Sequence, residues 1–329
     1  MTSPPAGFSD EILDDEQVSR EHRDLGLPPL EAEIEPESPQ VLQLALWAVI
    51  LLMATSAIYL GGRLFLPNNL AGGLQAIQDT LHNPMFWKAA AVGLLAQSID
   101  GALGMAYGIT SSTVLMASGA PPAVASASVH IAEVFTTGIS GCFHLKFGNV
   151  DQRLFLRLLL PGLLGAVLGA VMVSVLDGAV IKPYISLYLL GMGGYVISKV
   201  FRQLKIRRSE PRHVGKLAVF GGFVDAVGGG GWGPVVTSTL VGTGQDPRTT
   251  IGSVNLAEFF LTFASAIVFS ALVGDGPWPI VAGLVLGGLF AAPFAALLCR
   301  RLHARTLLIL VGSLISLLSL YNLFSALSG

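Results

Sequence analysis

Long apolar runs separated by short polar segments make up most of the chain after residue 40. A helix needs about 20 mainly apolar residues to cross a hydrocarbon layer about 30 Å thick, and several runs reach that length. The runs cover residues 41–60, 86–103, 107–118, 123–145, 154–176, 181–201, 217–227, 233–241, 249–273, 280–299 and 306–323. This pattern predicts an all-α polytopic membrane protein. Its first helix, residues 41–66, is expected to be retained in the membrane rather than cleaved, because no basic start with an early apolar core precedes it.

Several of the runs are too short to span a membrane, and these occur in pairs around glycine-rich breaks. One break reads DGALGMAYG from Asp100, and the other reads DAVGGGGWG from Asp225. Glycine costs a helix about 1 kcal/mol relative to alanine and opens backbone angles that other residues rarely adopt. Each break therefore predicts a re-entrant or discontinuous helix.

The two breaks belong to an internal repeat that aligns without gaps at a displacement of 125 positions. Matched identities include two acidic pairs, Asp100 with Asp225 and Glu133 with Glu258, and aromatic Tyr107 falls on aromatic Trp232. The other identities are Gly104 and Gly229, Gly108 and Gly233, Leu115 and Leu240, Gly119 and Gly244, Pro122 and Pro247, Ser128 and Ser253, Ala132 and Ala257, and Phe135 and Phe260. Matched acids are rare in apolar segments, so we interpret the pattern as a duplication.

Basic residues in the short loops predict the orientation of the repeats. Three loops rich in Lys and Arg are placed in the cytoplasm, and the loops near Asp177 and Asp275 are placed outside. The basic residues are Lys199, Arg202, Lys205, Arg207, Arg208, Arg212 and Lys216 in the first loop, Arg300, Arg301 and Arg305 in the second, and Lys146, Arg153 and Arg157 in the third. The turn at Gly119 then lies outside and its equivalent at Gly244 lies inside. The repeats would have inverted topology, as in secondary transporters whose discontinuous helices meet near the midplane.

The composition agrees with a membrane protein and separates an acidic N-terminal segment from the rest of the chain. The chain is 52% hydrophobic and 12% charged, which argues against a soluble enzyme, and 11 of its 21 acidic residues lie in the first 40 positions. We expect a disordered acidic cytoplasmic tail at residues 1–40. The predicted order is then the helix at 41–66, a first transport repeat at 86–201, a basic cytoplasmic loop at 202–216 and a second transport repeat at 217–326.

Outside the tail, four acids lie within apolar segments, and they are the two repeat-matched pairs Asp100, Glu133, Asp225 and Glu258. A carboxylate near the middle of a membrane costs about 2.5–3.5 kcal/mol, so such residues usually face a cavity or a partner. They are candidates for coupling transport to protons or cations. The structural alternative is that the aspartates accept backbone N–H groups at the breaks and the glutamates hold helices together.

His130 and Asn255 occupy equivalent places, each three positions before a glutamate and on the same helical face. His130 titrates near neutral pH when unperturbed and is a candidate proton carrier, whereas Asn255 can only form hydrogen bonds. A purely structural histidine is the alternative. We list both residues with the coupling candidates.

Hydroxyl groups follow each break. The candidate substrate-binding residues are Gly108, Thr110, Ser111 and Ser112 in the first repeat and Gly233, Thr237 and Ser238 in the second. A half-helix beginning at such a glycine presents free N–H groups and a positive dipole end, which suits a small oxyanion. The alternative is that the hydroxyls bond to their own helices. Because no lysine or arginine lies deep in the segments, nearby carboxylates would have to be protonated or paired when an anion binds, which suggests proton coupling.

Other chemistries find little support in the residues. Cys142 and Cys299 have no Cys or His neighbour with metal-ligand spacing, so we expect structural thiols, no metal and no cofactor. No strand precedes the GGGGWG run, which argues against a dinucleotide site. The basic loop lies between membrane segments, which favours an orientation signal or lipid contact over nucleic-acid binding. We expect neither catalytic residues nor enzyme activity.

These features resemble the sulfite exporter TauE/SafE family of membrane permeases over roughly residues 86–326. The resemblance rests on the paired glycine breaks, the short hydroxyl-bearing segments, the proline turns at Pro122 and Pro247, and the helices from Ser128 to Glu133 and from Ser253 to Glu258. It implies movement of small sulfur-containing anions, such as sulfite or organosulfonates, across the bacterial inner membrane. Met105, Ala106 and Tyr107 depart from a glycine-only break and would narrow the site.

The sequence thus predicts a secondary transporter in the inner (plasma) membrane that moves a small sulfur-containing oxyanion and is coupled to protons. An anion channel and a cation carrier that uses the intramembrane carboxylates remain alternatives. The expected partners are a small anionic substrate and membrane lipid, with no nucleic acid. A homo-oligomer is left open.

Overall fold

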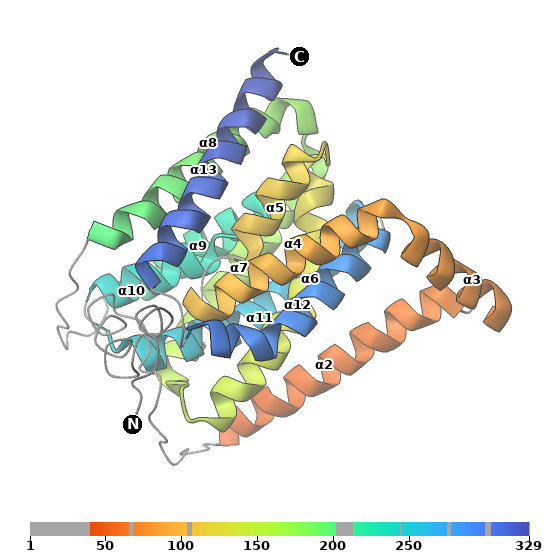
Figure 1. Cartoon of the computed structure of the whole chain (residues 1–329). Helices are drawn as coiled ribbons and strands as arrows, with labels where there is room; N and C mark the ends of the chain where they lie inside the picture. The colour runs from red at the N-terminus through yellow and green to blue at the C-terminus, as the bar shows by residue number, and fades with distance from the viewer. Residues whose placement is uncertain are drawn as a thin grey trace, which may run out of the picture.

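The computed structural model describes residues 40–65, 69–103, 107–201, 213–243, 245–274, 278–299 and 304–328, and all regular structure within them is helical (Figure 1). The elements in chain order are α2 (Gln40–Phe65), α3 (Asn69–His82), α4 (Pro84–Leu103), α5 (Tyr107–Ala117), α6 (Pro122–Lys146), α7 (Gln152–Val175), α8 (Gly178–Ser198), the 3-10 turn η1 (Lys199–Phe201), α9 (Val214–Gly228), the π-helical turn η2 (Gly233–Thr237), α10 (Ser238–Gly242), α11 (Pro247–Leu272), α12 (Trp278–Cys299) and α13 (Ala304–Ser328). The all-α prediction is confirmed for these residues. Most of the predicted runs match a helix to within a few residues.

Five of the described helices are long and apolar enough to cross a membrane: α2, α7, α8, α11 and α13. Their outer faces carry large apolar side chains. Leu160, Leu164 and Leu168 of α7, spaced one turn apart, are 72%, 57% and 53% exposed. Such a stripe would be unstable in water but is stable against lipid tails. The chain is therefore a multi-pass membrane protein.

Aspartates at helix starts account for several of the acids outside the apolar segments. Asp151 accepts a hydrogen bond from the N–H of Leu154 at 2.8 Å. Asp177 caps α8 in the same way, and Asp246 caps α11. These contacts satisfy N–H groups that a helix start leaves free.

Close helix crossings at glycines join the two halves of the chain. Packing of α4 against α12 brings Gly283 onto the backbone of Phe86, where a Cβ would collide with the carbonyl oxygen. Further along the same crossing, Gly287 lies against Ala90 of α4. Residue numbers rise together along both helices, so α4 and α12 run parallel. Small residues allow this close approach of two backbones.

The pair α7 and α9 repeats the arrangement. Gly165 of α7 lies against Val219, and Gly169, one turn later, lies against Phe223. The numbers again rise together, so these helices are parallel too. In each repeat, the helix before the break therefore packs on a helix of the other repeat: α4 on α12, and α9 on α7. The remaining helices pair across the repeats too, α6 with α11 and α8 with α13. Figure 1 shows the α8 and α13 pair side by side at one edge, with α2 along another.

Contacts made near the Gly119 turn and near the start of α11 lie at opposite ends of α7. At its C-terminal end, Gly178 packs against Pro122, which follows the Gly119 turn, with 3.5 Å from a Gly178 Cβ position to Pro122 Cδ. At its N-terminal end, the N–H of Asp151 donates to Ser253 Oγ at 2.8 Å. Ser253 lies in the first turns of α11. A helix of 24 residues is about 36 Å long, so the two contacts are separated by about that distance.

The apolar pattern did not reveal α3, because its residues are mixed in polarity. Other predictions fall outside the described residues: the tail at residues 1–39, most of the basic loop at 202–212, positions 104–106 of the first break, Gly244, Asp275, and Arg300 with Arg301. The side chains of Arg305, Pro247 and Cys299 are also outside the description. These predictions remain untested. α9 begins at Val214, so Lys216 lies in its first turn.

Candidate functional site

Each break is bridged by the aspartate that precedes it. Asp100 Oδ1 accepts the N–H of Tyr107 at 3.2 Å, and Asp225 Oδ1 accepts the N–H of Trp232 at 2.9 Å. The acceptor and donor are seven residues apart in both cases, so the repeat is seen in its hydrogen bonds as well as its sequence. The structural alternative for the aspartates, acceptance of free N–H groups at the breaks, is therefore observed. It does not exclude a further role for their second oxygens.

The two breaks touch each other at glycines. Gly230 has a φ of +141°, and a Cβ on it would collide with the backbone of Gly108 and Ile109. In the opposite direction, a Cβ on Gly108 would lie 2.6 Å from Gly230 Cα and 2.7 Å from Glu133 Oε1. Only glycine allows this approach and this backbone angle. The breaks of the two repeats thus form one crossing.

A small cavity of about 20 Å³ lies beside this crossing. Its lining comes from both repeats: Gln97, Asp100, Tyr107, Gly108, Ile109, Glu133, Thr136, Thr137, Ser140, Gly230, Gly231, Gly233, Pro234, Asn255 and Glu258. A space of this size holds about one water molecule. The first residues of α5 and of η2 belong to the lining, so two helical N-termini meet there.

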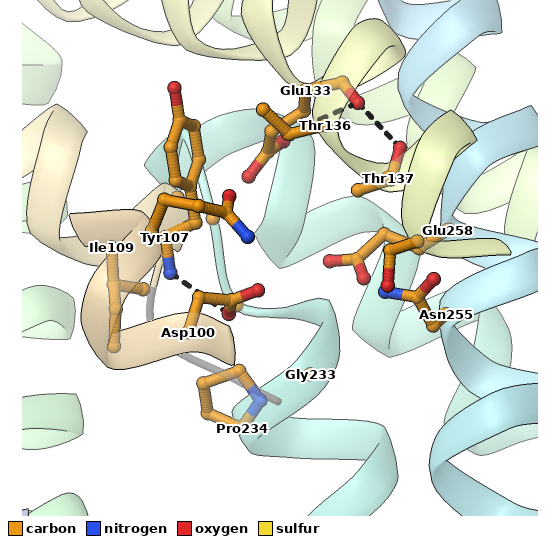
Figure 2. A pocket seen from close by; sticks show the side chains of 15 residues that line it. Asp100, Tyr107, Ile109, Glu133, Thr136, Thr137, Gly233, Pro234, Asn255 and Glu258 are labelled. Atoms are coloured by element: carbon orange, nitrogen blue, oxygen red, sulfur yellow. Dashed lines mark hydrogen bonds between the residues drawn. The ribbon is translucent and has the colours of Figure 1, made fainter. Parts of the chain in front are cut away.

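Three carboxyl side chains line the cavity: Asp100, Glu133 and Glu258. Figure 2 shows Glu133 and Glu258 reaching toward the same space from α6 and α11. Glu133 is 3% exposed, and within the described part of the chain its Oε2 has no hydrogen-bond partner. No lysine or arginine is among the lining residues of the described chain. The site is therefore acidic in composition.

Of the two equivalent polar residues, only Asn255 reaches the cavity. Its Oδ1 has no hydrogen-bond partner among the residues described. His130 points instead to the second break, where Nε2 lies 3.3 Å from Asp225 Oδ2. The structure thus brings four of the six coupling candidates to the cavity, and it pairs the other two, His130 and Asp225, outside its lining.

Comparison with known proteins shows the family of the chain. The family model described as sulfite exporter TauE/SafE matches residues 89–322, more than two thirds of the chain. The chain belongs to the TauE/SafE family. It is also 47% identical, over 246 residues, to the probable membrane transporter protein YtnM of Bacillus subtilis (strain 168), an alignment that covers 72% of this chain and 82% of the relative. No solved structure matches. Family and relative together indicate a membrane transporter.

The hydroxyl groups predicted to bind substrate in this TauE/SafE protein lie next to the cavity lining rather than in it. Thr110 and Ser111 are buried on α5, and neither hydroxyl has a partner in the described residues. Ser112 Oγ donates to the carbonyl of Ile109 at 3.4 Å, while Thr237 is buried at the end of η2 and Ser238 at the start of α10. Gly108 and Gly233 do line the cavity. Whether any of these residues binds substrate remains a prediction.

Sequence reasoning missed several lining residues of the TauE/SafE site. Thr136 and Thr137 lie one turn after Glu133, and Thr137 Oγ1 donates to the Glu133 carbonyl at 2.5 Å. The spacing of three and four residues from Glu133 could have indicated them. Gln97 could not be found through the repeat, because its equivalent position is Gly222. The π-helical turn η2 was also unexpected, and such turns are common at functional sites.

Proposed function

We propose that this protein is a secondary transporter that moves a small sulfur-containing oxyanion, of the sulfite or organosulfonate class, across the inner membrane together with protons. The observation that carries the proposal is the cavity where two helix breaks and three carboxyl groups meet. The family description, sulfite exporter, supports the substrate class.

We infer that the two repeats have opposite orientation, with the N-terminal tail in the cytoplasm. Support comes from the contacts that place the Gly119 turn and the start of α11 at opposite ends of α7. Further support is a pocket beside the Gly119 turn. It is lined by Asn83 and Met85, at the start of α4, and also by Leu115 and Ser118, at the end of α5. An α4–α5 unit that starts and finishes at one end is what a re-entrant hairpin requires.

The positive ends of two short helices would stabilise an oxyanion in the cavity. α5 begins with Tyr107 and Gly108, and η2 begins with Gly233, and all three line the space. The N–H of Tyr107 is already donated to Asp100, so the anion would be stabilised by the later N–H groups of the first turns and by the two helix dipoles. The unpartnered hydroxyls of Thr110 and Ser111 lie one turn further along α5. They would donate hydrogen bonds to the anion when the site widens.

The carboxyl groups supply the reason for proton coupling. An ionised Glu133 or Glu258 would repel an anion in so small a cavity, whereas a protonated carboxyl can donate a hydrogen bond to it. Substrate and proton would therefore bind together. Since the space holds about one water, the described conformation is closed to a sulfur oxyanion, and binding requires the two breaks to separate.

A cation carrier is the second candidate, because three carboxyl groups line a cavity without lysine or arginine. Against it, no three His, Cys, Asp or Glu side chains of the described chain are grouped as ligands for one metal ion. An anion channel is distinguished by kinetics, since its flux would rise with driving force without saturation.

The test is flux in liposomes with the purified protein. We expect saturable sulfite and sulfoacetate transport that responds to an imposed pH gradient. Glu133→Gln and Glu258→Gln should still bind the anion but lose the response to pH, because glutamine donates a hydrogen bond but carries no exchangeable charge. Asp79→Asn, at an exposed acid on α3, is the matched control and should behave as wild type.

Two results would overturn the proposal. Transport of neither anion by folded protein would remove the substrate class. Loss of substrate binding in both glutamine variants, with flux of a cation in the wild type, would establish the cation carrier instead.

A further inference from the structure

His130 is a fully buried histidine that joins the two repeats. It lies on α6 of the first repeat, and its Nε2 is 3.3 Å from Oδ2 of Asp225 on α9 of the second. The side chains are 0% and 1% exposed. Neither belongs to the cavity lining, so this is a separate polar site next to the second break.

The hydrogen bonds around His130 determine where its protons are. Nδ1 lies 2.9 Å from the backbone carbonyl oxygen of Ser126, which can only accept, so Nδ1 carries a hydrogen. Ser126 Oγ is 3.3 Å from Nδ1, but its own hydrogen is directed to the carbonyl of Ala226 at 2.5 Å. The Ser126 hydroxyl therefore cannot supply a proton to Nδ1.

A second proton must then lie between Nε2 and Asp225. A neutral imidazole with its hydrogen on Nδ1 has a lone pair on Nε2, and an ionised carboxylate also presents only lone pairs. The contact is attractive only if one more proton is present, either as imidazolium facing carboxylate or as neutral imidazole accepting from the carboxylic acid. Both forms contain the same number of protons, and the pair is electrically neutral in each.

The same pair holds the second break in place. Asp225 Oδ1 accepts from the N–H of Trp232 across the break, while Oδ2 faces His130. Together with the bond from Ser126 to Ala226, this gives two attachments of the end of α9 to α6. Removing the shared proton would turn one attachment into a repulsion of lone pairs and leave a net negative charge at the break.

The surroundings of the pair are acidic. The titratable groups that interact electrostatically with Asp225 are Glu133 on α6, Glu258 on α11 and Tyr188 on α8. Asp100 on α4 interacts with both glutamates, and Tyr107 on α5 interacts with Glu133 and Asp100. Phe269 of α11 covers the imidazole, with 5.5 Å between ring centroids. The charge on the pair therefore changes the electrostatic potential at the carboxyl groups of the cavity.

Among the described residues, the first break has no equivalent histidine and aspartate pair. Asn255 stands where the repeat would place a second histidine, and an amide does not titrate at physiological pH. The carrier is therefore asymmetric, with one histidine and aspartate pair for two breaks.

We propose that His130 and Asp225 bind and release one proton in each transport cycle, and that this proton controls how firmly the second break is attached to α6. The inference rests on the proposed proton-coupled transport. Binding of the proton closes the break onto α6, and its release to whichever side is open frees the break to move away from Gly108.

A measurement that needs no substrate tests the pair directly. Nitrogen NMR of 15N-histidine-labelled full-length protein in lipid nanodiscs reports which ring nitrogens carry protons. We expect a hydrogen on Nδ1 of His130, bonded to the Ser126 carbonyl, and an Nε2 signal that changes with pH. In Asp225→Asn, whose amide can donate to Nε2, the signal should no longer change with pH, while the fold is kept. A hydrogen on Nε2 alone, or a signal that is flat in the wild type, would overturn the proposal.

Transport provides the second measurement. Sulfoacetate is the better probe here, because sulfite itself titrates near neutral pH. With the membrane potential clamped at zero, each coupled proton contributes about tenfold accumulation for each unit of pH gradient. His130→Asn, which copies the residue of the second repeat, should lower the accumulation by one such factor and leave downhill exchange intact. His144→Asn, at a histidine remote from the break, is the control and should accumulate as much as the wild type.

The two measurements separate the proposals. If sulfoacetate is not transported at all, the proposed substrate class fails, but the NMR titration still decides whether the pair holds the proton. If wild type accumulates sulfoacetate and His130→Asn accumulates it equally, the pair is not the coupled site even though proton coupling stands.

Discussion

Glycines in the two breaks are the residues least able to change. A Cβ on Gly108 would meet the backbone of Gly229 and Gly230 and the carboxyl of Glu133 at 2.6–2.9 Å. Backbone atoms cannot rotate away as a flexible side chain can, so the breaks would have to separate.

For Gly108→Ala we expect a loss of about 1–3 kcal/mol in the free energy of unfolding and a large loss of flux, as for overpacking of a close-packed core. Unfolding in detergent and liposome flux would be measured together. Gly191→Ala is the matched control, because a Cβ there has nothing within 4 Å, and it should not reduce stability. Equal stability of both variants would show that the breaks are less tightly packed than described.

Asp100 offers a test of the cap at the first break. Its Oδ1 accepts the N–H of Tyr107, and an unpaired buried N–H costs about 1–3 kcal/mol. Asp100→Ala should lower the free energy of unfolding by about that amount, whereas Asp100→Asn keeps an oxygen acceptor and should lower it less. Equal losses in the two variants would mean that the charge of Asp100, rather than its hydrogen bond, stabilises the break.

At the scale of elements, α3 differs from the spanning helices. Leu74, Ile77 and Leu81 share one of its faces and are all exposed, while Asp79 is exposed on the opposite face. An amphipathic helix with both faces uncovered suits the boundary between headgroups and hydrocarbon.

We therefore expect α3 to lie along the membrane surface. A nitroxide at Ile77→Cys should be accessible to oxygen in the lipid, and one at Asp79→Cys to a water-soluble relaxing agent, both in a chain with Cys142→Ser and Cys299→Ser. Equal access of the water-soluble agent to both positions would place α3 in water instead.

The whole molecule is arranged around two parallel helix pairs, α4 with α12 and α7 with α9, which place the breaks against each other. If the repeats are inverted, repeat-matched residues lie on opposite sides of the membrane. Ser118 and Thr243 are such a pair, 125 positions apart and both exposed.

Labelling from the two sides tests this arrangement. In the same cysteine-free chain, an impermeant thiol reagent applied outside intact cells should modify Ser118→Cys and not Thr243→Cys, because basic loops favour the cytoplasm. Permeabilised cells should show labelling of both positions. Modification of both from outside would exclude inverted topology.

The sequence by itself determined the apolar helices, the position of each break and the four acids within apolar segments, but not α3 or the π-helical turn η2. These signals are local, since a run of about 20 apolar residues, a glycine cluster and a buried charge are all read within one segment. The 125-residue repeat added that Asp100 and Asp225 have equivalent roles, and both indeed accept the N–H seven residues on.

Only the tertiary structure decided which of these residues meet. His130 and Asn255 are equivalent in sequence, yet one binds Asp225 and the other lines the cavity. The hydroxyl-bearing residues after each break are close in sequence to residues that line the cavity, but they do not line it themselves. The physical reason is that partners 95 positions apart, such as His130 and Asp225, are brought together by helix crossings, and crossings are set by the packing of both backbones at once.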